Sequence, residues 1–61
     1  MFYILAKWKG EGYSRRRTDY QYEGKAIRVA NDLFNRNHYE IIKVIDSDCQ
    51  QEVYSIGKEE T

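Results

Sequence analysis

The sequence contains no proline, one cysteine and one histidine among its 61 residues. A lone Cys49 cannot form an internal disulfide, so the disulfide framework of many small secreted domains is absent and a cytoplasmic, reducing compartment is expected. His38 and Cys49 are too few for a tetrahedral zinc site, and no CxxC or HExxH spacing occurs. The composition therefore predicts neither a metal site nor a cofactor.

Long apolar runs are also missing. No stretch approaches the roughly 20 apolar residues of a membrane span, and Met1–Trp8 lacks the basic start of a signal peptide. We therefore expect a soluble protein that has no membrane partner.

The sequence also lacks the usual signatures of catalysis. It has no residue pattern typical of a catalytic triad, and Gly10-Glu11-Gly12 lacks the third glycine of a phosphate-binding loop. A chain of this length has little volume for a deep substrate pocket, because its core needs the same side chains. We predict that the protein is not an enzyme.

The clearest periodic segment that is present is Lys25–Asn37. At helical spacing, an arc of about 160° holds its apolar residues, which are Ala26, Ile27, Val29, Ala30, Leu33 and Phe34. Gly24 is the expected N-cap, and an asparagine at the end of the segment is expected to adopt the left-handed cap conformation. Since the flanking segments alternate with period two, this helix is predicted to cover a β-sheet.

Four strands are predicted around the helix. They are Phe2–Lys9, with its even residues including Trp8 toward the core, a second strand that begins at Arg15 after the loop Gly10–Ser14, then Tyr39–Asp46 and Gln51–Ile56. The predicted fold class is α+β, with element order ββαββ and one helix packed on one face of a four-stranded antiparallel sheet of order 2-1-3-4. Residues 1–57 are expected to form a single small domain, and residues 58–61 a frayed polar tail.

The predicted sheet has a second face that no helix covers. By alternation this open face carries Tyr3, Leu5 and Lys7, together with Ile41 and Ile45. An exposed apolar surface of this kind would indicate a protein partner or a second copy of the chain.

Charge is distributed unevenly, although the net charge is zero. Residues 1–30 hold seven basic and three acidic residues, whereas the remainder holds three basic and seven acidic ones. The molecule is therefore predicted to be a charge dipole, which can steer a charged partner toward one end.

The basic half contains a hairpin in which cationic and aromatic residues are interleaved. Guanidinium groups make paired hydrogen bonds to carboxylates and phosphates, and arginine and tyrosine are enriched in protein interfaces. We predict a non-enzymatic protein-interaction module, an accessory subunit or a small inhibitor of the kind that phages encode, which docks on a larger protein or assembly with an acidic surface. The predicted partner-binding residues are Lys7, Lys9, Tyr13, Arg15, Arg16 and Arg17 of the hairpin, with Tyr3 and Leu5 of the open face.

Two alternatives stay open from the sequence. The same Arg, Tyr and Trp residues could bind single-stranded nucleic acid, although zero net charge weighs against it because phosphate neutralisation dominates such binding. A homodimer through the open sheet face is the other alternative.

Overall fold

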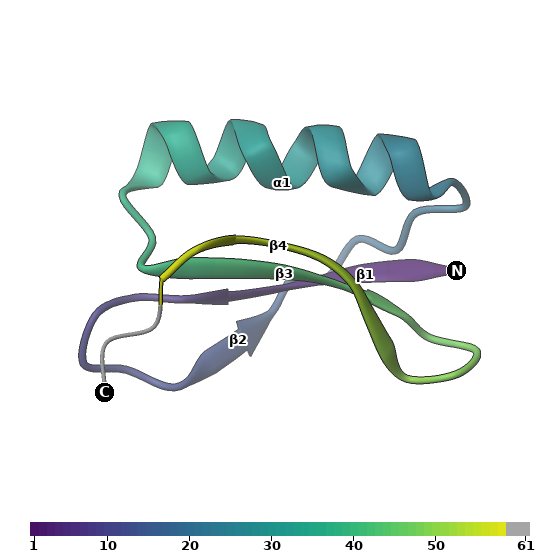
Figure 1. Cartoon of the computed structure of the whole chain (residues 1–61), viewed down its shortest axis with the longest axis horizontal. Coiled ribbons are helices and arrows are strands. Elements are labelled where there is room, and N and C mark those ends of the chain that lie inside the picture. Colours follow the sequence, from purple (N-terminus) through teal and green to yellow (C-terminus); the bar gives the residue numbers. More distant parts are fainter. Residues whose placement is uncertain (59–61) are drawn as a thin grey trace.

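The computed structural model describes residues 1–58 of the chain. Its elements are β1 (Phe2–Lys7), β2 (Tyr13–Arg15), α1 (Glu23–Asn37), β3 (Ile41–Asp46) and β4 (Gln51–Gly57). The helix lies along one face of the sheet (Figure 1). Of the predicted frayed tail, the residues after Lys58 lie outside the described part of the chain.

The four strands form one antiparallel sheet of order β2-β1-β3-β4. After crossing the sheet as a helix, the chain returns as β3 beside β1, with Phe2 opposite Asp46 and Lys7 opposite Ile41. The predicted fold class and strand order are confirmed. The β1–β2 loop and the β3–β4 turn lie at opposite ends of the sheet (Figure 1).

The core lies between α1 and the sheet. It is formed by the buried residues Ile4, Ala6, Ala26, Ala30, Ile42 and Val44. Alternate residues of β1 and β3 face the helix. The two buried helix residues, Ala26 and Ala30, have small side chains, so the helix can lie close to these strands. Larger side chains such as Leu33 and Phe34 pack around this centre and are partly buried.

Both ends of α1 differ from the prediction. The amide of Ala26 donates to the carbonyl oxygen of Tyr22 at 3.2 Å, so Tyr22 is the N-cap and the helix begins before Gly24. At the other end His38, not an asparagine, adopts the left-handed conformation (φ 55°, ψ 36°). Asn37 instead donates its side-chain amide to the carbonyl of Leu33 at 3.1 Å. Because this bond keeps Asn37 within the last turn, the reversal falls on the next residue.

The second strand lies earlier than predicted and is short. It covers Tyr13–Arg15, so Tyr13 and Ser14 belong to the strand and not to the loop, and β2 ends at the residue where the predicted strand begins. The amide of Arg16 still donates to the carbonyl of Ile4, and Tyr20 pairs with Phe2 in an isolated bridge. Between these two contacts the chain has the three residues Arg17–Asp19 opposite the single residue Tyr3, so it bulges out of the sheet. Two of the three consecutive arginines therefore lie beyond the end of β2.

Candidate functional site

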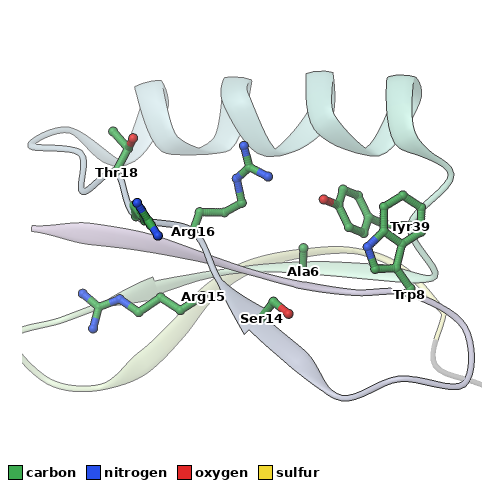
Figure 2. Close-up of a pocket in the computed structure, with 8 residues that line it drawn as sticks. Ala6, Trp8, Ser14, Arg15, Arg16, Thr18 and Tyr39 are labelled. Carbon is green, nitrogen blue, oxygen red and sulfur yellow. The ribbon is translucent and has the colours of Figure 1, made fainter.

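The helix covers only three of the four strands. It contacts β1, β3 and β4 but not β2, so the side of β2 that faces the helix layer is left uncovered within the described residues. A groove of about 360 Å³ lies there. Its lining residues are Ala6, Trp8, Ser14, Arg15, Arg16, Arg17, Thr18 and Tyr39, and we call it the arginine groove (Figure 2).

The three arginines of the groove differ in their surroundings. Arg15 extends to the open face of the sheet, where its guanidinium lies 4.0 Å above the ring of Tyr3 and bonds to Asp19 at 3.2 Å. Arg16 extends to the opposite side, toward α1 (Figure 2). Neither Arg16 nor Arg17 has an acidic partner among residues 1–58, and both are exposed.

Two aromatic rings close one end of the groove. Trp8 and Tyr39 pack with ring centroids 4.1 Å apart and planes tilted by 37°. Trp8 follows the last residue of β1 and remains 40% exposed, so its predicted core position is wrong. The strand alternation stops at Lys7, and the indole finds its contact on the segment that links α1 to β3. The hydroxyl of Tyr39 points toward the side on which Arg16 lies (Figure 2).

The groove suits an anionic ligand. Its lining includes Arg16, Arg17 and the hydroxyl residues Ser14, Thr18 and Tyr39, and among the described residues no Asp or Glu lines it. The guanidinium of Arg15 lies on the other face of the sheet and is not among these donors. Guanidinium and hydroxyl groups donate hydrogen bonds, and fixed donors without a competing acceptor favour carboxylate or phosphate oxygens.

The open sheet face has the predicted residues but not the predicted exposure. Tyr3, Ile41 and Ile45 lie there, yet each is at most 9% exposed, and Leu5 is partly buried. The prediction of an exposed apolar surface is therefore wrong. Its cause is a cover of long cationic side chains, which lay their apolar stems over the sheet and keep their charged ends in water.

Lys43 forms the second part of this cover. Its ammonium lies 5.1 Å above the ring of Tyr13 and 3.3 Å from the carboxylate of Glu52. The Tyr13 hydroxyl, and after it Glu52, raises the pKa of Lys43 above its usual value, because both stabilise the charged amine. Tyr13, predicted as a partner-binding residue, thus contributes to a contact within the chain.

The two lysines of the hairpin differ in burial. The ammonium of Lys7 pairs with the carboxylate of Glu40, and their side chains are only 15% and 7% exposed. Lys7 therefore joins β1 to the segment before β3, and we assign it to stability. Lys9 lies exposed at the start of the β1–β2 loop and does not line the arginine groove.

Sequence reasoning missed Tyr39, Ser14 and Thr18. Tyr39 had been assigned to a strand, but β3 begins only at Ile41, because the chain is still turning after His38. The hydroxyl residues lie in the hairpin and the bulge, and no sequence pattern marks them as lining a groove. Their placement depends on where the helix ends relative to the sheet edge.

Comparison with known proteins adds no relationship to these observations. No protein-family model, no curated protein and no solved structure matches the chain. Within residues 1–58 no helix is long and apolar enough to span a bilayer, and no three His, Cys, Asp or Glu side chains cluster to hold a metal.

Proposed function

We propose that the protein is a non-enzymatic interaction module that docks on an acidic segment of a larger protein through the arginine groove. It would act there as an accessory subunit or as an inhibitor. One observation carries the proposal. Arg16 and Arg17, which have no acidic partner in the described part of the chain, line a groove beside the aromatic pair of the exposed Trp8 and the half-buried Tyr39.

These residue types fit a protein interface. Arginine, tryptophan and tyrosine are the residues that most often dominate binding energy, because each buries a large flat surface and also donates hydrogen bonds. An acidic side chain could pair with Arg16 or Arg17 while its neighbour packs against Trp8. The positive charges that line the groove would also steer an acidic partner toward it.

Single-stranded nucleic acid is the second candidate, because Arg16, Arg17 and Trp8 could contact phosphates and a base. Two observations weigh against it. One face of Trp8 is already occupied by Tyr39, which leaves a single stacking surface instead of a row of them. The acidic turn at Asp46 and Asp48 would repel a longer polyanion.

A titration distinguishes the two candidates. The first probe is a labelled peptide of about ten residues in which glutamate alternates with tyrosine and valine, and the second is an oligothymidylate of similar length. We expect the peptide to bind, and the double variant Arg16→Ala/Arg17→Ala to bind it about tenfold or more weakly, since each lost charged hydrogen bond contributes roughly 1.5–3 kcal/mol at most. Both arginines are exposed, so the variant should fold normally.

Lys25→Ala/Arg28→Ala is the matched control. It removes two positive charges from exposed residues of α1, the same number as the groove variant, and leaves the groove intact. Peptide binding that this control reduces as much as the groove variant would mean attraction by net charge alone. Tighter binding of the oligothymidylate than of the peptide, lost in the groove variant, would favour the nucleic-acid function instead.

A further inference from the structure

The outer edge of β2 carries backbone groups that β1 does not use. In an antiparallel ladder, residues alternate between those whose N–H and C=O bond to the neighbouring strand and those that point away from it. The amide of Arg16 donates to Ile4 at 2.9 Å, so Arg16 faces β1, and Ser14, opposite Ala6, does the same. The intervening Arg15, and Tyr13 by the same alternation, direct their N–H and C=O groups outward.

This edge differs from the other edge of the sheet. β4 is interrupted by a register shift opposite Val44 and Ile45, and it ends at Gly57 with a φ of +101°. Such irregularities twist an edge strand and hinder the addition of another strand. The pairing of β2 with β1 shows no shift between Tyr13 and Arg15, and all three of its residues are exposed. Although the bulge at Arg17–Asp19 confines this regular edge to a few residues, β2 is the edge beside which the arginine groove lies.

Charge determines which strand can pair with β2. A second copy of the chain would bring two sets of Arg15, Arg16 and Arg17 side by side, and like charges facing one another across a ladder are destabilising. An acidic strand would meet them with opposite charge. Since α1 does not cover β2, alternate side chains of an added strand would also enter the arginine groove beside Arg16.

We propose that the partner contributes an extended acidic segment, which adds to the outer edge of β2 as a fifth strand and directs every second side chain into the arginine groove. This inference rests on the proposed function and specifies its binding mode. The main-chain bonds to Tyr13 and Arg15 supply affinity, and the arginines select acidic side chains.

Amide hydrogen exchange measured by NMR tests the binding mode with the same acidic peptide. With the peptide present at about ten times its dissociation constant, the amides of Tyr13 and Arg15 should exchange about tenfold more slowly, because they are exposed only in the free fraction. The amides of Ser14 and Arg16, already bonded to β1, should change little. Single N-methylation along the peptide should weaken binding at every second position only, because alternate amides face β2.

The outcomes separate the two proposals. If the peptide binds and needs Arg16 and Arg17, but exchange at Tyr13 and Arg15 is unchanged and N-methylation has no period of two, strand addition is wrong while acidic docking stands. If no acidic peptide binds, both are wrong. Protection of the β4 amides instead of those of β2 would place the added strand on the other edge and overturn this inference.

Discussion

At the scale of single residues, Gly57 shows how closely the end of β4 approaches its neighbours. It adopts a φ of +101°, a conformation that L side chains rarely take. A methyl group added to it would overlap the carbonyl oxygen of Glu40 and lie 2.8 Å from Cε1 of Phe34. The glycine lets β4 end directly against the segment that leads into β3.

We predict that Gly57→Ala lowers the free energy of unfolding by about 2–3 kcal/mol, from backbone strain together with overpacking. For a domain of this size the loss corresponds to a fall in Tm of roughly 10–20 °C. Thermal unfolding followed by circular dichroism measures it. Gly12→Ala is the control, since no atom of residues 1–58 lies within 4 Å of its added methyl group. Equal effects of the two substitutions would contradict the argument.

At the scale of elements, α1 is tied to the sheet by more than apolar packing. The hydroxyl of Tyr54 on β4 donates to the side-chain oxygen of Asn31 on the helix at 2.8 Å. Because a hydrogen bond is directional, this bond restricts sliding of the helix along its own axis. Contacts between apolar side chains restrict sliding less, because they are not directional.

We predict that Tyr54→Phe lowers the free energy of unfolding by about 1 kcal/mol, because it removes one hydrogen bond and keeps the ring. Urea unfolding measures the change in midpoint. Tyr22→Phe removes the same hydroxyl from a residue that is 69% exposed, and among the described residues this hydroxyl has no hydrogen-bond partner. This control should leave the midpoint unaltered. A shift of similar size in both variants would show that the Tyr54 bond contributes nothing net.

Element positions also show what periodicity can and cannot predict. The apolar arc of α1 and the alternation of β1 and β3 predicted their types correctly, because burial of one face is decided by spacing along the chain. The bulge after Arg16 was not predictable in this way. The bulge depends on how many residues separate the two contacts with β1, which are made by Arg16 and Tyr20. That number is set by the pairing of the strands.

At the scale of the whole molecule, the sheet has one face covered by the helix and another covered by its own cations. Arg15 lies over Tyr3 and Lys43 over Tyr13. Tyr3, Ile41 and Ile45 are buried without a partner, whereas Tyr13 stays 38% exposed. Soluble monomers rarely expose large apolar patches, and this arrangement removes one.

We therefore expect sedimentation equilibrium to find a monomer. The double variant Arg15→Ala/Lys43→Ala should uncover Tyr3 and Tyr13 and increase self-association or the binding of a hydrophobic dye, since the stems of both side chains are lost. Arg36→Ala/Lys58→Ala, which removes two charges from exposed residues elsewhere, is the matched control. A wild-type protein that dimerises through the open face would contradict the shielding.

The sequence by itself determined the element types, the sheet order and the identity of the basic hairpin, because these follow from the spacing of apolar residues and from composition. Only the tertiary structure decided which cations are available to a partner. Lys7 pairs with Glu40 and Arg15 with Asp19, whereas Arg16 and Arg17 line the groove. Pairing depends on side chains that are distant in sequence meeting in space, as Lys7 and Glu40 do across the sheet. The positions of the helix ends and of the bulge in the edge strand determine which side chains come into contact, and the periodicity of the sequence predicts neither position.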